Sequence, residues 1–308
     1  MSADGGAGPF RCSALSRSLA EPMFATASTV VRWLLVEQPG AWGVHAVAQS
    51  RLPREVSGAL AQQAAAHGVR VVLIRRPGRH VPDGIQVYAA HAGLEEPWLE
   101  HIHLPDAAAL LDLDLSHLAR GRPLGAGTRQ AEPVYLVCTN GRHDPCCSER
   151  ARPVAAALRH RFGDRAWEVS HIGGDRFAPT VVCLPAGVYL GRVDAEAAVD
   201  VVERFESARL DLAHYRGRCA YDFPTQAAEY FLRERLGLDG LDGVRLIRRR
   251  RPEPRRLVAR FAAGAATYSV TVAVERAAGD RLLTCRGDAV VQPPAYRLVA
   301  VEEDSDPA

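Results

Sequence analysis

Thiols, an imidazole and a carboxylate follow two predicted strands in the middle of the chain. Cys138 ends one short apolar run, and Cys146 and Cys147 follow across a turn-rich loop. A predicted helix and a second apolar run then lead to His171 and Asp175, in a glycine-bearing loop. Because the two strands of a β-α-β unit are parallel, both loops leave the sheet at the same edge. Sulfur, nitrogen and oxygen ligands brought to one edge are typical of a metal site.

The spacing of these residues narrows the kind of metal site. The chain contains no Cys-x-x-Cys pair, which the common zinc motifs use. Two ligand pairs carried by two loops, one of them rich in sulfur, favour a small iron–sulfur cluster. Cys146 and Cys147 compete for a single ligand position, so one of them is a substitute ligand or a packing residue.

Four further residues are expected to support the ligands from the same loops. Gly173 and Gly174 should let the loop backbone approach the site closely. Arg176 could offset the negative charge of a cluster. His143 lies between the cysteines; it is either a surface histidine or a hydrogen-bond donor to a cluster sulfur.

Composition sets the class of protein and excludes several partners. With 308 residues and 47% hydrophobic content, the chain can build two or three domains with real cores. A net charge of +2 gives no case for nucleic-acid binding. The first 20 residues do not resemble a secretory signal, and no apolar run approaches the roughly 20 residues of a membrane span. We therefore expect a cytoplasmic protein that does not bind membranes, in which the seven cysteines act as ligands, redox thiols or core residues.

The predicted elements divide the chain into a repeated unit and a third piece. Residues 10–120 read as a compact strand–helix–strand unit without ligand-type loop residues, and 121–133 read as a Gly- and Pro-rich linker. Residues 134–212 repeat that order and carry the cysteine and histidine loops, and 213–301 predict a small α+β domain. The expected helices are 53–67, 106–120, 152–162, 195–208 and 224–236. The expected strands are 30–37, 69–74, 85–88, 98–104, 134–137, 166–170, 180–184, 188–193, 244–249, 257–261, 267–274 and 282–285.

Three motifs resemble the sucrase/ferredoxin-like family. Residues 138–147 read Cys-Thr-Asn-Gly-Arg-His-Asp-Pro-Cys-Cys, 171–178 read His-Ile-Gly-Gly-Asp-Arg-Phe-Ala, and 184–193 read Leu-Pro-Ala-Gly-Val-Tyr-Leu-Gly-Arg-Val. Supporting stretches lie at 33–43, 74–79 and 215–218, so the likeness spans about residues 10–290. The resemblance implies an α/β fold with tandem thioredoxin-like domains followed by the small α+β domain. It also implies that the second of these domains holds a [2Fe–2S] cluster.

The resemblance also assigns the ligands. By position, Cys138 and Cys147 become the thiolate pair, with Cys146 as the substitute, and His171 becomes the first ligand of the second loop. Eukaryotic members resemble a site with a second histidine four residues on, where this chain has Asp175. No carboxylate pair is placed as a glycosidase requires, so sucrose hydrolysis is not expected.

These features predict an electron carrier rather than an enzyme. Such a protein exchanges single electrons with a redox partner protein, either a reductase or an acceptor. One alternative is a thiol-redox enzyme in which Cys138 or the Cys146–Cys147 pair is the nucleophile. Another is a structural zinc protein that uses the same ligands in a closed tetrahedral site.

Overall fold

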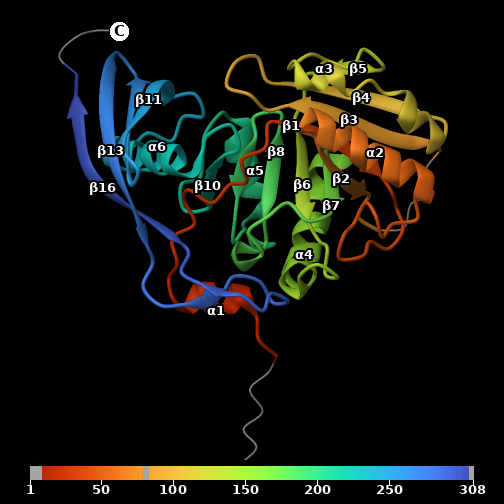
Figure 1. Cartoon of the computed structure of the whole chain (residues 1–308), viewed down its shortest axis with the longest axis horizontal. Helices are drawn as coiled ribbons and strands as arrows, with labels where there is room; N and C mark the ends of the chain where they lie inside the picture. Colours follow the sequence, from red (N-terminus) through yellow and green to blue (C-terminus); the bar gives the residue numbers. More distant parts are fainter. Residues whose placement is uncertain (1–8, 79–82, 305–308) are drawn as a thin grey trace, which may run out of the picture.

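A single ten-stranded sheet forms the centre of the molecule, with a smaller sheet beside it (Figure 1). The computed structural model describes residues 9–78 and 83–304. The order of strands in the large sheet is β10-β9-β8-β6-β7-β2-β1-β3-β4-β5. The first half of this sheet holds β1 (Arg32–Glu37), β2 (Arg70–Arg75), β3 (Ile85–His91), β4 (Trp98–Leu104) and β5 (Thr128–Gln130). The second half holds β6 (Val134–Cys138), β7 (Ala166–Val169), β8 (Val181–Leu184), β9 (Val188–Leu190) and β10 (Tyr215–Arg218).

The two halves of the sheet have the same internal arrangement. In each half the first and second strands are parallel, and the third strand is antiparallel to the first. The halves join where β2 and β7 pair antiparallel, through Ile74 with Val169 and Arg75 with Glu168. Only the carboxyl-terminal residues of β2 and β7 pair with each other. Because the pairing is antiparallel, the chain that leaves β7 runs beside the start of β2, and the chain that leaves β2 runs beside the start of β7. The joint therefore places the loop after β7 next to the beginning of β2.

Helices cover the sheet through alternating strand residues. Leu34 and Val36 of β1 face a core built with α2 (Arg54–His67), whereas Tyr135 and Val137 of β6 face α4 (Pro145–Phe162) and α5 (Ala198–Glu206). The other faces of both strands share one core, which contains Cys138. The turns and short helices are η1 (Ala108–Asp112), α3 (Ser116–Ala119), η2 (Gly163–Arg165) and η3 (Asp175–Phe177).

The helix that follows the cysteine loop starts earlier than the sequence predicts. The prediction began it at Arg152, but the helix begins at Pro145 and contains Pro153. Asp144 caps α4 instead, since its carboxylate accepts from Cys146 N at 2.9 Å, and Pro145 opens the first turn. Cys146 and Cys147 therefore sit on a helix N-terminus rather than in a loop.

Two other element predictions were wrong between the sheet halves. The helix expected at 106–120 is split into η1 and α3, because Leu113 has an extended backbone and Asp114 starts a new turn by accepting from Ser116 N. The linker at 121–133 contains β5, which extends the large sheet by pairing with β4.

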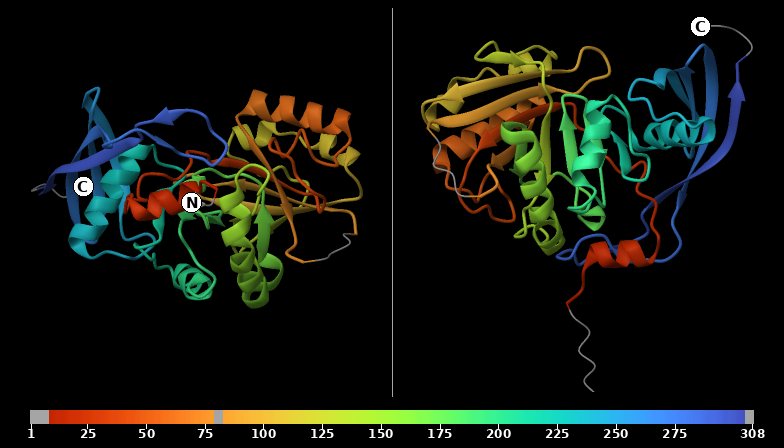
Figure 2. Two further views of the ribbon diagram at one scale, coloured as in Figure 1. Left: turned by 90° about the horizontal axis from the view of Figure 1, so that it is seen from below. Right: turned by 180° about the vertical axis from the view of Figure 1, so that it is seen from behind.

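The C-terminal part of the chain builds the second sheet and then returns to the first. The four-stranded sheet consists of β11 (Arg245–Glu253), β12 (Arg256–Ala263), β13 (Ala266–Arg276) and β16 (Pro294–Glu303), with α6 (Phe223–Leu236) on one face. Between β13 and β16 the chain forms the short pair β14 (Arg281–Leu282) and β15 (Val290–Val291), so the strand expected at 282–285 is mostly loop. This pair lies beside α1 (Cys12–Ser18), below the end of the large sheet (Figure 2).

The observed architecture confirms the expected class at a coarse level. It is a mixed α/β fold with a large sheet and a separate small sheet. Among the helices of residues 9–78 and 83–304, none is long and apolar enough to cross a membrane.

Candidate metal centre

The residues singled out by spacing converge at the edge of the sheet where β6 and β7 end. Cys138 is the last residue of β6, Cys147 is in the first turn of α4, and Asp175 begins η3 after the loop that carries His171. Cys138, Cys147 and Asp175 are almost fully buried, while the His171 side chain is 29% exposed. The group is therefore a buried thiol and carboxylate set with an imidazole at its outer edge.

Asp175 is the point at which these side chains meet. Its Oδ1 lies 3.0 Å from His171 Nδ1 and accepts from Cys147 Sγ at 3.4 Å. His143 Nε2 lies 3.6 Å from Asp175 Oδ2, and the His143 ring stacks on His171 with centroids 3.6 Å apart. His143, His171 and Asp175 can together hold a metal ion. His143 was expected only to support the site; the structure brings it to ligand distance.

The charges in the group are strongly linked. Burial lowers the pKa of His171, but the hydrogen bond and charge of Asp175 outweigh it, and the net pKa is raised. Burial raises the pKa of Asp175, but His171, His143 and Cys147 outweigh it, and the net pKa is lowered. Each group thus favours the charged form of the other. A metal ion bound here would replace any proton on the ligating nitrogen of His171.

The two thiols of this group influence each other's ionisation. The contact with Cys147 lowers the pKa of Cys138, whereas Cys138 and burial raise the pKa of Cys147 well above its ordinary value. Cys138 is therefore the thiol of the pair that ionises more readily.

The loop that carries His171 is held by glycines and by a buried arginine. Gly173 and Gly174 both have positive φ, and a β-carbon on them would clash with Ser28 and Arg216 respectively. The Arg216 guanidinium is fully buried; its Nη1 donates to Gly173 O at 3.2 Å, and burial lowers its pKa to about 10. Sequence reasoning quoted Arg216 only within a family motif. Its strand, β10, reads Tyr-Arg-Gly-Arg, so no apolar run marked Arg216 as a buried residue.

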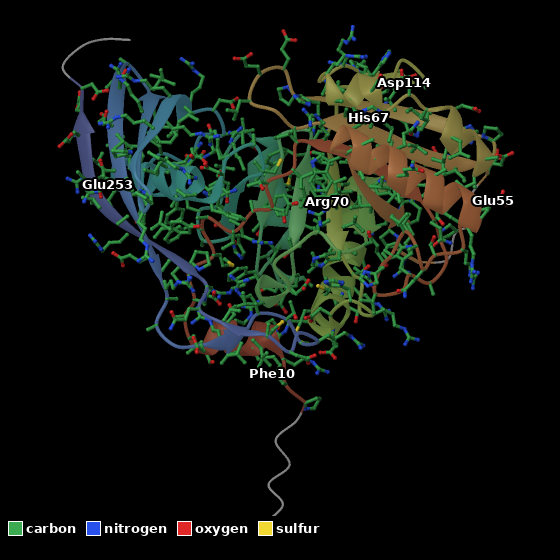
Figure 3. The ribbon with its side chains drawn as sticks, viewed as in Figure 1. Phe10, Glu55, His67, Arg70, Asp114 and Glu253 are labelled. Carbon is green, nitrogen blue, oxygen red and sulfur yellow. The ribbon has the colours of Figure 1, made fainter. Side chains whose placement is uncertain are left out.

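The first half of the sheet supports the site through backbone contacts. Arg70, at the start of β2 and labelled in Figure 3, donates from Nη2 to His171 O at 3.0 Å. Gly43 O accepts from Asn140 Nδ2 at 3.1 Å, and Val44 O lies 3.3 Å from His143 Nδ1. Arg176, expected beside the site, instead pairs with Glu21 at 3.0 Å. The first half thus fixes both ligand-bearing loops without placing a side-chain ligand in this group.

A second group of possible ligands lies around the start of α4. Cys146, the proposed substitute ligand, points away from Cys138 and meets Cys12 of α1 and Cys285, which follows β14. Asp144 completes this group, which can hold a metal ion. The pKa of Cys146 falls to about 6, chiefly because Cys12 donates a hydrogen bond to it. Sequence reasoning gave Cys12 and Cys285 no ligand role, and no local spacing connects them with α4.

Comparison with known proteins agrees with the motifs. The sequence model of the sucrase/ferredoxin-like family matches residues 23–217, which include β6, the α4 N-terminus and the loop of His171 and Asp175. Neither the curated proteins nor the solved structures contain a match to the chain. The matched segment covers more than half of the 308 residues and contains Cys138, Cys147, His171 and Asp175. The chain therefore belongs to the sucrase/ferredoxin-like family.

Proposed function

We propose that this protein is a single-electron carrier with one [2Fe–2S] cluster held by Cys138, Cys147, His171 and Asp175. The observation that carries the proposal is the meeting of two thiols, an imidazole and a carboxylate from the segments at the ends of β6 and β7. A [2Fe–2S] cluster needs two ligands on each iron, and this set supplies them as two natural pairs. When bound, the cluster would supply reversible one-electron chemistry.

The environment of the pairs suits such a group. The contact with Cys147 lowers the pKa of Cys138, which favours the thiolate that a cluster needs. The buried Arg216 acts on both Cys138 and Asp175 and would offset part of the negative charge of a loaded site. Replacing thiolates by an imidazole also reduces that charge, so the potential should exceed that of an all-cysteine site.

The exposed side of the group suggests where a redox partner protein would dock. His171 and His143 have side chains 29% and 27% exposed, whereas the thiols and Asp175 are buried. A partner that covers the stacked imidazoles would approach the cluster most closely there. These rings also keep bulk water from the thiols.

The repeated strand order supports tandem thioredoxin-like domains, with the cluster in the second. In each half the order is second strand, first strand, third strand, fourth strand, with a helix between the first two. The first domain, at residues 10–120, would serve as the scaffold for the domain at 134–212.

A thiol-redox enzyme is the weaker candidate. A nucleophilic thiol must reach its substrate, yet Cys138 and Cys147 are each only 2% exposed and Cys146 is fully buried. The close contact between Cys138 and Cys147 is better suited to binding one metal centre than to attacking a substrate.

Anaerobic purification of the full chain tests the proposal. We expect a brown protein with broad visible bands, and iron and acid-labile sulfide in equal amounts, sufficient for one cluster per chain. Cys138→Ser and Cys147→Ser should each lower bound iron at least about tenfold. Cys183→Ser is the control, because Cys183 is a buried thiol of β8 outside both groups. A colourless protein, or iron unchanged in both variants, would reject the cluster; zinc lost from both would favour the structural zinc alternative.

A further inference from the structure

Three thiols and one carboxylate from distant parts of the chain converge beside α1. Cys12 Sγ lies 3.8 Å from Cys146 Sγ and 3.5 Å from Cys285 Sγ, and Cys146 Sγ lies 3.4 Å from Cys285 Sγ. Asp144 Oδ2 is 3.4 Å from Cys12 Sγ. All four donor atoms lie within 4.8 Å of one another. Figure 3 draws sulfur atoms close to α1, above the labelled Phe10.

Four of the six separations in this group are close to the edges of a tetrahedron around one small metal ion. With zinc–sulfur bonds of about 2.3 Å, two tetrahedral thiolates lie about 3.8 Å apart. A thiolate and a carboxylate oxygen on the same ion lie about 3.6 Å apart, given zinc–oxygen bonds of about 2.1 Å. The observed distances of 3.4 to 3.8 Å fall close to both values, so an ion could enter with little movement.

The surroundings are those of a closed ligand site. Cys12, Asp144 and Cys146 are at most 1% exposed. Backbone N–H groups already orient the donors, since Cys12 N donates to Cys285 Sγ at 3.3 Å and Cys285 N donates to Asp144 Oδ2 at 2.7 Å. The Ser13 hydroxyl is fully buried and has no hydrogen-bond partner among the described residues. Ser13 also lowers the pKa of the Cys146 thiol. Its hydroxyl can therefore donate to the Cys146 sulfur once a metal has displaced the thiol proton.

One ion fits this group better than a second cluster. A binuclear cluster needs its ligands in two pairs, one for each iron, as the group around Asp175 supplies them. Here the three thiols form a single triangle, and the carboxylate caps it. Three thiolates also favour a borderline-soft ion over magnesium or calcium.

We propose that Cys12, Asp144, Cys146 and Cys285 form a second, structural metal site for a four-coordinate zinc ion. All four positions around the ion come from the protein, so the site is closed and has no place for a substrate. Its role is to fasten α1 and the segment after β14 to the N-terminus of α4. The site is independent of the proposed cluster, because the two groups share no ligand.

The adjacent cysteines of α4 provide a matched pair of variants for the test. We would purify the full chain anaerobically and measure zinc and iron in the same sample. About one zinc per chain is expected, and Cys146→Ser or Cys285→Ser should lower it at least about tenfold without loss of iron. Cys147→Ser should do the opposite, keeping zinc and losing iron. If iron is absent from every sample but zinc follows Cys146 and Cys285, the proposed function fails and this site stands.

Cobalt(II) gives a second readout that does not depend on the variants folding. Wild-type protein depleted of zinc and reloaded with Co²⁺ should show intense thiolate-to-cobalt bands and the visible bands of tetrahedral Co²⁺. Bands of octahedral cobalt only, zinc that is equal in wild type and Cys285→Ser, or iron that depends on Cys285 would each overturn the assignment. A Cys12–Cys146 disulfide found by mass spectrometry in the anaerobic protein would overturn it as well.

Discussion

The two halves of the large sheet have one strand order but use their loops differently. After β7 the second half presents His171 and Asp175, which meet two thiols. At the end of β2 the first half presents arginines instead: Arg75, its last residue, pairs with Glu168 at 2.6 Å, and Arg76 lies over the Trp167 ring at 3.6 Å. The end of the second strand is thus followed by possible metal ligands in the second half. In the first half, the corresponding position carries arginines that bind the second half.

The difference shows how a repeated unit can separate chemistry from support. The joint between β2 and β7 places each loop beside the start of the other half's strand. Arg70 holds the backbone of His171 from one side, and Arg76 Nη1 holds the carbonyl of Asp164 from the other, at 2.7 Å. The first half therefore stabilises the second half, which carries the group around Asp175. Substitutions of Asp175, Arg75 and Tyr135 test this difference between the halves.

The largest effect is expected from Asp175, the proposed fourth ligand, in the second half. Asp175→Ala should lower bound iron about tenfold or more, because it removes an oxygen donor and the partner that orients His171. Asp175→His should keep a cluster and raise its potential, since a neutral imidazole replaces an anionic carboxylate. Iron content and a redox titration measure both outcomes.

His143→Ala is the matched control for that pair. His143 touches the same carboxylate from the other side, with Nε2 3.6 Å from Asp175 Oδ2. If Asp175 is the ligand, His143→Ala should keep most of the iron. Full occupancy and an unshifted spectrum in Asp175→Ala, with loss of iron in His143→Ala, would transfer the ligand role to His143.

A smaller effect, on stability, is expected from the joint between the halves. Arg75→Met leaves Glu168 almost buried without its cation, although Thr139 Oγ1 still donates to it at 2.7 Å. Removing one partner of such a pair should lower the free energy of unfolding by about 3 kcal/mol. The double variant Arg75→Met with Glu168→Gln should recover most of that loss. Urea unfolding measures both.

The surface pair of Arg161 and Glu203 is the control for the joint. Its side chains are 54% and 40% exposed, so Arg161→Met should cost less than about 0.5 kcal/mol. An equally small cost for Arg75→Met would mean that Arg75, the last residue of β2, does not hold the two halves of the sheet together.

The smallest effect is expected on the opposite face of the ligand strand. Tyr135 of β6 points into the core with α4 and α5, and its hydroxyl donates to Glu206 at 2.6 Å. Tyr135→Phe should cost about 1 kcal/mol and leave bound iron unchanged, because Cys138 faces the other core. A loss of iron in this variant would show that the two faces of β6 are not independent.

The cost of Tyr135→Phe should also depend on pH. Burial raises the pKa of Glu206, but the hydrogen bonds from Tyr135 and Arg165 outweigh it and the net pKa is lowered. A carboxylate with a lowered pKa stabilises the fold above its unfolded pKa of about 4.3, and that contribution is lost as pH falls through its folded pKa. The stability difference between wild type and variant should therefore shrink in acid.

Local patterns predicted that the residues around Asp175 would lie close together, because they belong to one β-α-β unit. Parallel strands bring their carboxyl ends to one edge, so residues after β6 and β7 had to be neighbours. The group at Cys12 and Cys285 could not be predicted in this way. It depends on where the ends of the chain lie against α4, which no periodicity records.

The last strand of the small sheet was missed for a local reason. The strand β16 alternates until a bulge, where Leu298 pairs with Val272 and Ala300 with Thr271, which leaves Val299 as an extra residue. Val299 is exposed, at 42%, and interrupts the alternation that marks a strand. Alternation did identify β12 and β13, which have no such interruption within their mutual pairing.

The contact between Cys12 and Cys285 bears on the order in which the protein can fold while it is being synthesised. All four residues of the group around Asp175 leave the ribosome within one short stretch, and their loops can meet while synthesis continues. The sulfurs of Cys12 and Cys285, 3.5 Å apart in the finished fold, lie 273 positions apart along the chain. Cys12 must wait until Cys285 has been made, so this contact closes late, after the group around Asp175 can form.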